Sequence, residues 1–230
     1  MFSVSPVIRL TRKMIGSIGI LGGTGPAGRG LAVRLAEAGC TVVIGSREPA
    51  RAALVASELA WRGRGTVSGG TNEDAGSCDI VVLATPWDSA LETVKPLRDA
   101  LAGKVVISMV NALVRQGREL VPLLPARGSM AGELAAALPA SKVTGAFHHL
   151  PAAQMEDLSS DLSADVVVVG DDPSARATTV ELVNLISALR AVEAGSLALA
   201  GAVESFTAVC ISINIRHKAH TYVRLAGLGE

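Results

Sequence analysis

Residues 17–28 read S-I-G-I-L-G-G-T-G-P-A-G, an apolar run that passes directly into a glycine-rich turn. The run Ser17–Leu21 has the length and composition of a buried strand. Pro26–Ala38 follows as a helix, because its apolar residues recur on one helical face. The order strand, glycine turn, helix predicts the first unit of a doubly wound α/β fold.

The glycines of this turn have the spacing G-x-G-x-x-G, at Gly23, Gly25 and Gly28. In a dinucleotide-binding loop the first glycine permits the tight turn, the second lets the backbone approach a pyrophosphate, and the third lets the helix pack closely. A nucleotide kinase or GTPase loop would instead need Gly-Lys-Ser/Thr where this chain has Arg29-Gly30. The predicted dinucleotide-binding loop comprises Gly22, Gly23, Thr24, Gly25, Pro26, Ala27 and Gly28.

The end of the second predicted strand, Thr41–Gly45, indicates which dinucleotide binds. An NAD enzyme usually places Asp or Glu there, to accept from the ribose 2′-hydroxyl. This chain has Ser46 and Arg47 instead, with Arg51 one turn further on, and these groups suit a 2′-phosphate. The alternative is that both arginines are solvated residues at a helix start, a position that is unfavourable for arginine. The sequence therefore favours NADP.

The remaining apolar runs alternate with helical segments and predict a Rossmann-type, doubly wound α/β fold with a mostly parallel sheet and a small helical C-terminal part. The further strands are expected at Asp79–Thr85, Lys104–Val110, Lys142–Phe147 and Ala164–Gly170. The further helices are expected from Pro49, around Ser89–Leu101, at Pro173–Arg190 and at Leu197–Arg216. We expect a disordered leader (residues 1–16), a dinucleotide-binding domain (17–172) and a smaller C-terminal helical region (173–230).

Composition narrows the class of protein. The 21 basic and 21 acidic residues balance and are interspersed, so nothing favours a nucleic-acid partner or an acidic membrane surface. Cys40, Cys78 and Cys210 are scattered in or beside apolar sequence, which indicates free thiols in a reducing cytoplasm. The longest apolar stretch, Gly195–Ile215, contains Glu204 and several hydroxyls and is interpreted as a packed helix, not a membrane span.

Read together, these residues resemble the NADPH-dependent coenzyme F420 reductases, also called F420H2:NADP oxidoreductases. The resemblance extends from about Gly16 to Leu228, and the histidine-rich and C-terminal motifs are its more specific parts. The motifs that carry it are Leu21–Gly25, Gly45–Arg47, Thr85–Trp87, Ala146–Ala153, Gly170–Asp172 and Val203–Ser205.

The resemblance implies reversible hydride transfer between NADP(H) and the 8-hydroxy-5-deazaflavin coenzyme F420, in a homodimer. It implies that Thr24, Ser46, Arg47 and Arg51 hold the 2′-phosphate. It places Pro86, Trp87, Leu150 and Pro151 at the cofactors, and His148, Ser205 and Thr207 at the deazaflavin. The C-terminal region would close the deazaflavin site. The family commonly has an arginine at the position of Gly201, which this chain lacks.

His148 is the candidate catalytic residue, because a donor at the deazaflavin ring could stabilise the charge that builds up on reduction. The alternative is a structural histidine that bonds to the backbone at a strand end. His149 is expected to point the opposite way on an extended chain. Ser205 and Thr207, two residues apart, do not share a helix face, so both reach one ligand only near a helix start.

Two other functions fit the same dinucleotide loop. One is an NADPH-dependent reductase of another acceptor, such as a flavin, a ferric chelate or an imine. The other is a non-catalytic NADP(H) sensor, since a fold alone does not define an activity. Metal chemistry is not expected, because the chain has neither H-E-x-x-H nor a cysteine–histidine spacing typical of metal sites.

Overall fold

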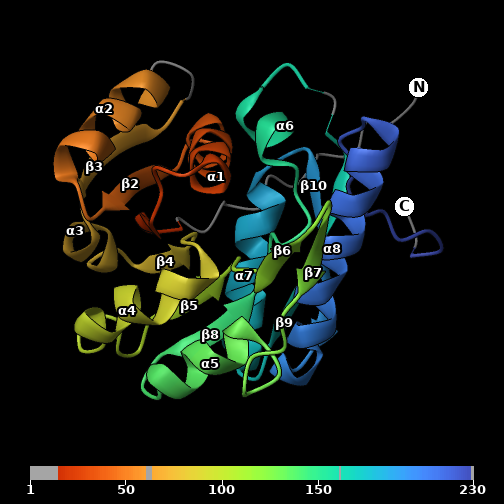
Figure 1. Ribbon diagram of the computed structural model, residues 1–230. Helices are drawn as coiled ribbons and strands as arrows, with labels where there is room; N and C mark the ends of the chain where they lie inside the picture. Colours follow the sequence, from red (N-terminus) through yellow and green to blue (C-terminus); the bar gives the residue numbers. More distant parts are fainter. Residues whose placement is uncertain (1–14, 61–63, 161, 229–230) are drawn as a thin grey trace, which may run out of the picture.

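The computed structural model describes residues 15–60, 64–160 and 162–228, and its centre is an eight-stranded sheet flanked by helices (Figure 1). Residues 1–14 of the expected leader lie outside the described residues. The strands are β1 (Ile18–Leu21), β2 (Thr41–Ser46), β3 (Thr66–Thr71), β4 (Ile80–Leu83), β5 (Val105–Ser108), β6 (Leu113–Gln116), β7 (Glu119–Pro122), β8 (Lys142–Gly145), β9 (Ala164–Gly170) and β10 (Leu189–Gly195). The α-helices are α1 (Pro26–Glu37), α2 (Pro49–Leu59), α3 (Asn72–Gly76), α4 (Ala90–Val94), α5 (Met130–Ala137), α6 (Ala152–Glu156), α7 (Pro173–Leu185) and α8 (Ala200–His217). Short 3-10 turns lie at η2 (Trp87–Ser89), η3 (Lys95–Leu97) and η4 (Leu197–Leu199).

The strand order is β10-β9-β8-β5-β4-β1-β2-β3. The chain runs outward from β1 through β2 to β3 and then returns to β4 on the other side of β1. The pairs from β3 to β8 are parallel, whereas β9 is antiparallel to β8 and β10 is parallel to β9. The predicted doubly wound, mostly parallel sheet is confirmed, and its topological switch point lies between β1 and β4.

Side chains of alternate residues on the central strands belong to two separate hydrophobic cores, one on each face of the sheet. Ile80 and Val82 pack with α1, α2 and α7. Val81 and Leu83 pack with α3, α4 and α5. Because a sheet covered on both sides must be apolar on both sides, the continuous apolar run that predicted this strand follows directly from its place in the fold.

Helix α1 is joined to α6 by a buried arginine. The Arg34 guanidinium donates from Nε to Met155 O at 2.9 Å and from Nη2 to the carbonyls of Gln154 and Asp157, each at 2.7 Å. Arg29, one turn nearer the glycine turn, pairs with Glu156 at 2.7 Å. These bonds satisfy carbonyls at the end of α6 and fix the segment before it relative to α1.

Part of the expected secondary structure is wrong. The helix expected at Pro173–Arg190 ends at Leu185, and β10 begins at Leu189 and pairs with β9. A short apolar run of this length suits a strand or a helix equally, and pairing with β9 decides it. The prediction also lacked β3, the β6–β7 hairpin, α5 and the short α3 and α6. Their residues carry no long apolar period, because they are half-exposed or very short.

Helix α8 is held in place by a buried carboxylate. Glu204 is only 4% exposed, and its two oxygens accept from Met130 N at 2.7 Å and Ala131 N at 2.9 Å, at the start of α5. By length and composition, the helical stretch Leu197–His217 could cross a membrane, a property that the core helices of many proteins share. In this fold the carboxylate of Glu204, which lies within this stretch, accepts hydrogen bonds from the start of α5.

Glu204→Gln should lower the free energy of unfolding by about 1–3 kcal/mol, because one backbone N–H of α5 then faces an amide NH2 instead of an oxygen. Burial raises the folded-state pKa of Glu204 to about 7 from an ordinary value of 4.5, against the opposing effect of its two backbone hydrogen bonds. Between those pH values the unfolded chain binds fewer protons than the folded one. The wild-type advantage over the variant should therefore shrink as the pH rises from 4.5 to 7.

Urea unfolding of both proteins at several pH values across that window measures this difference. A difference that stays constant, or that grows with pH, would contradict the prediction.

Candidate active site

The glycine turn after β1 lies at the switch point of the sheet, where an open α/β fold binds its ligand. A Cβ on Gly28 would lie 2.6 Å from Gly23 Cα, so the close approach of α1 to the turn requires glycine there. A Cβ on Gly25 would meet its nearest protein atom, Gly22 O, at an ordinary 3.7 Å. Protein packing therefore leaves Gly25 open, as expected if a ligand approaches the backbone at the start of α1.

A cleft of about 220 Å³ extends from this turn to the end of β2. Its lining includes Gly22, Thr24, Gly25, Ser46, Arg47, Arg51 and Pro86 of the expected site. The Ser46 hydroxyl accepts from Glu48 N at 3.1 Å, and both arginines are exposed at the rim. The cleft thus brings together a hydroxyl and two guanidinium groups, the set that suits a 2′-phosphate.

The lining of this cleft differs from the predicted site at two residues, Asn72 and Trp87. Asn72 lines it and accepts from Gly22 N through Oδ1 at 3.4 Å, although the sequence did not single it out. Trp87 opens η2, is 37% exposed, and is not among the residues that line the cleft. Pro86, directly before it, does line the cleft.

A second cavity, of about 280 Å³, lies on the other side of the glycine turn. Ala27 at the start of α1 lines this cavity, whereas Thr24 and Gly25 line the first cleft, so residues of one short segment border both hollows. The walls are formed by the segment after β8 and by α8. They include His148, Leu150, Pro151 and Thr207 of the expected site, together with the apolar Met109, Phe147 and Ile211.

An asparagine that follows β5 organises this cavity. Asn111 Oδ1 lies 3.1 Å from His148 Nδ1, and its Nδ2 donates to His148 O at 3.2 Å. The Thr207 hydroxyl donates to the same Oδ1 at 3.1 Å, and lies 3.3 Å from His148 O. Three segments far apart in sequence are therefore fixed to one another by a small polar network.

His148 is neutral in this site. Burial, with a smaller effect from His149, lowers the pKa of His148 to about 3. Because Asn111 presents an oxygen to Nδ1, the hydrogen-bond network assigns the ring proton to Nδ1 and a lone pair to Nε2. Nε2 is buried with no hydrogen-bond partner among the described atoms, and would lie 3.1 Å from a Cβ on Gly145. Donation from Nε2 to a ligand would require the other tautomer.

The expectation that His149 points away from His148 is wrong. β8 ends at Gly145, and Phe147 has φ +65°, so the chain is not extended here and both rings line the same cavity. His149 Nε2 lies 2.6 Å from Val203 O, which links this segment to α8. Ser205 is half-buried and is not among the described residues that line this cavity, as its position two residues from Thr207 on α8 requires.

The structure explains why no arginine stands at residue 201. A Cβ on Gly201 would lie 2.3 Å from Gly128 O, so α8 passes the turn before α5 too closely for any side chain. Of the other bases near the C-terminus, Arg216 pairs with Glu119 at 2.6 Å and Arg224 donates to Ser163.

Three asparagines that line the hollows were not predicted as site residues. Asn72 lines the cleft, and Asn111 and Asn214 line the second cavity. A signal existed for Asn111, which directly follows the expected strand Lys104–Val110 at the ligand-binding edge of the sheet. Asn72 follows β3, a strand too poor in apolar residues to be predicted. Within the described ranges, no group of three or more His, Cys, Asp or Glu side chains could hold a metal ion.

A phosphate loop at the switch point, with guanidinium groups beyond β2, defines a dinucleotide-binding α/β protein of the NADP type. Residues 17–112 match the family model described as NADP oxidoreductase, coenzyme F420-dependent. The chain is 36% identical over 220 residues to the F420-dependent NADP reductase of Methanocaldococcus jannaschii, covering 92% of this chain and 98% of that one. The chain therefore belongs to the family of coenzyme F420-dependent NADP oxidoreductases, and the resemblance seen in the sequence is confirmed.

Two other relatives share less with this chain, one in sequence identity and the other in the share of its length that is matched. A solved structure of a putative F420-dependent NADP-reductase from Arthrobacter sp. FB24 has a TM-score of 0.78 at 22% identity, covers 92% of this chain and 100% of that one, and shows the shared fold. The rat metalloreductase STEAP3 is 31% identical over 188 residues, which cover 82% of this chain and 36% of that protein.

Arg47→Ala should weaken NADPH binding about ten- to a hundredfold, because one charge-assisted hydrogen bond contributes about 1.5–3 kcal/mol. NADH, which lacks the 2′-phosphate, should bind almost as before. Fluorescence titrations with both nucleotides measure the effect, and Arg98→Ala, which removes an exposed arginine outside the cleft, is the matched control. Equal losses for NADPH and NADH would mean that Arg47 supports the fold and not the phosphate.

Proposed function

We propose that this protein is an NADPH-dependent F420 reductase, which transfers a hydride reversibly between NADP(H) and the 8-hydroxy-5-deazaflavin coenzyme F420. The observation that carries the proposal is that the glycine turn and the start of α1 border two hollows: a cleft suited to NADP and a largely apolar cavity. Family membership specifies the second ligand as coenzyme F420. Gly25, which packing leaves open, fits a pyrophosphate at the start of α1.

Hydride transfer between two bound ring systems requires the protein to position the rings and to exclude water, since the cofactors supply the chemistry. The residues at this junction suit both tasks. Met109, Phe147 and Ile211 contribute apolar surface to the wall of the second cavity, and Ala27 at the start of α1 also lines it. No charged side chain is needed at the reacting carbons.

We assign the individual roles as follows. Gly22–Gly28 bind the pyrophosphate, and Thr24, Ser46, Arg47 and Arg51 bind the 2′-phosphate. Pro86, Leu150 and Pro151, which line the two hollows, contact the rings, and Thr207 lies on the deazaflavin side. Trp87 and Ser205 are not among the described residues that line either hollow, and we assign them no ligand contact. His148 is the proposed catalytic residue at the deazaflavin: Asn111 holds its neutral imidazole through Nδ1, and donation from Nε2 to the ring takes the other tautomer.

We also propose that residues 173–230 close the deazaflavin site, since Thr207, Ile211 and Thr221 all line the second cavity. The protein is proposed to work in the cytoplasm, because all three cysteines are buried and free.

A homodimer is proposed on the outer face of α8. Phe206, Val209 and Ile213 recur there at helical spacing and are 46%, 46% and 38% exposed, and Leu199, in η4 directly before α8, is 46% exposed. Such an apolar stripe on a helix is typical of a surface that a second subunit covers.

The purified protein should bleach the visible absorbance of F420 on addition of NADPH, with no metal added and in the presence of a chelator. His148→Ala should slow this reaction by at least about tenfold and change NADPH binding little, because its proposed contact is on the other ring. Asn111→Ala should act in the same direction, since Asn111 fixes the orientation of the imidazole. Stopped-flow absorbance gives the rates, and fluorescence titration gives the affinity.

His217→Ala, which removes an exposed histidine at the end of α8, is the matched control. An unchanged rate in His148→Ala would make His148 structural. Oxidation of NADPH by a flavin or a ferric chelate, and not by F420, would overturn the proposed acceptor. NADPH binding without oxidation by any acceptor would instead indicate a sensor.

Phe206→Asp should convert a dimer to a monomer, because a carboxylate in the centre of an apolar interface is buried without a partner. Light scattering coupled to gel filtration measures the mass of each protein. Leu54→Asp, at another exposed apolar residue on α2, should leave the dimer intact. A wild-type monomer at micromolar concentration would contradict the proposal.

A further inference from the structure

The chain beyond α8 folds back beside the second cavity. It turns at Lys218, whose φ is +50°, and continues as a C-terminal strap, defined here as residues 219–228. Asn214 Oδ1, on the last turns of α8, accepts from Thr221 N at 2.7 Å and Thr221 Oγ1 at 2.8 Å. Both Asn214 and Thr221 line the cavity that contains His148. The near end of the strap is therefore part of the cavity wall.

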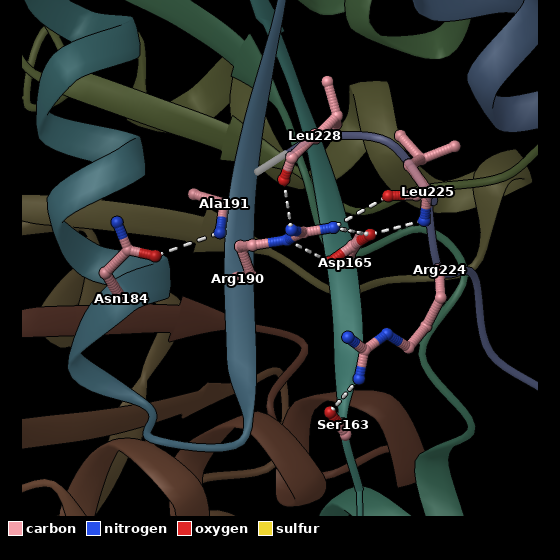
Figure 2. Close-up of polar contacts among 8 residues, drawn as sticks. All are labelled: Ser163, Asp165, Asn184, Arg190, Ala191, Arg224, Leu225 and Leu228. Atoms are coloured by element: carbon pink, nitrogen blue, oxygen red, sulfur yellow. Dashed lines mark hydrogen bonds and ion pairs between the residues drawn. The ribbon is translucent and has the colours of Figure 1, made fainter. Parts of the chain in front are cut away.

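The far end of the strap is held by an ion pair between two neighbouring strands (Figure 2). Asp165 on β9 and Arg190 on β10 stand opposite each other in the sheet register, and their side chains are 2.7 Å apart. Arg190 also donates to the carbonyls of Leu225 and Leu228, each at 2.9 Å. Leu225 N donates to the Asp165 carboxylate, so both members of the pair bind main-chain atoms of the strap.

The strap also lies along the same region of β9, on the edge that faces away from β10. β8 pairs with β9 only at Val169 and Gly170, because β8 ends at Gly145. Further along that edge, Asp165 N donates to Val223 O at 2.8 Å. The strap therefore continues the position of β8 beside β9, beyond the end of β8.

Polar bonds dominate the attachment of the strap. Asp165 is only 2% exposed, and the Arg190 guanidinium beside it lowers the pKa of its carboxyl, so the pair is charged at neutral pH. Tyr222 adds an apolar contact with the core beneath. Charge-assisted bonds fix direction as well as affinity, so this pair determines where the strap lies.

We propose that Asp165 and Arg190 are positioning residues for the acceptor site: they hold the strap so that Asn214 and Thr221 form the outer wall against the deazaflavin ring. This inference rests on the proposed function. The N–H of Thr221 can only donate, so the Asn214 atom that faces it must be the amide oxygen. The Nδ2 of Asn214 is then the donor on this wall, and a ring carbonyl is the acceptor it suits.

Arg190→Met should weaken F420 binding about tenfold, as expected for a lost charge-assisted bond, and leave NADPH binding within about twofold. Fluorescence titration of the full-length protein gives both affinities, with F420 added to protein saturated with NADP. Trypsin cleavage at Lys218 and Arg224, both exposed, should accelerate because the strap is released. Arg190→Lys should restore part of the F420 affinity.

Arg176→Met is the matched control, since Arg176 pairs with Glu193 of β10 at 2.6 Å and donates to Gly170 O and Asp171 O, none of which belongs to the described strap. Asn214→Asp tests the wall directly: it keeps oxygens for Thr221 but lacks the Nδ2 donor. It should weaken F420 binding with trypsin resistance unchanged, and it does not depend on Arg190→Met folding.

Faster cleavage in Arg190→Met with unchanged F420 affinity would overturn the inference, as would equal losses for F420 and NADPH. Unchanged F420 affinity in Asn214→Asp would overturn the role of its Nδ2. A wild-type protein that binds NADPH but shows no response to F420 would overturn the proposed function itself, a result distinct from any effect confined to the variants.

Discussion

Helix α1 approaches the glycine turn before it so closely that position 28 has no room for a side chain. Both hollows of the site depend on this contact. It directs the start of α1 at the phosphate cleft, and Ala27, on the first turn, becomes part of the second cavity. Arg34 of α1 donates to carbonyls of α6 and so fixes α6 relative to α1. The segment with Leu150 and Pro151 directly precedes α6, so its position depends on the same bonds. One backbone approach thus sets the geometry of both hollows.

Asparagine amides, which cannot ionise, hold the polar groups around this junction. Asn72 fixes the glycine turn, Asn111 fixes the imidazole of His148, and Asn214 fixes the strap. Each amide offers a donor and an acceptor at once, so it can join a backbone group to a side chain without adding charge. Burial lowers the pKa of both His148 and His149, so the two imidazoles that line the second cavity are uncharged at neutral pH.

The sequence predicted those helices and strands whose apolar residues recur with a clear helical or strand pattern. The strands β1, β2, β4, β5, β8 and β9 and the helices α1, α2, α7 and α8 were found, because each has an apolar face or is apolar throughout. β10 was mistaken for helix, since Leu189–Gly195 is short and its partner β9 lies elsewhere in the chain. The relation of His148 to His149 depended on the left-handed backbone at Phe147, which no spacing rule reveals for a non-glycine residue. Pairwise contacts across the fold, such as Gly201 with Gly128, have no local signal.

The covering of β9 by the strap has a consequence for the behaviour of the protein at high concentration. An uncovered strand edge presents unpaired N–H and C=O groups, which can pair with the same edge on another chain. Here Val223 O takes the N–H of Asp165, and the ion pair with Arg190 holds this cover in place. The residues that wall the cavity also shield the sheet, so release of the strap would expose a template for intermolecular β-pairing and aggregation.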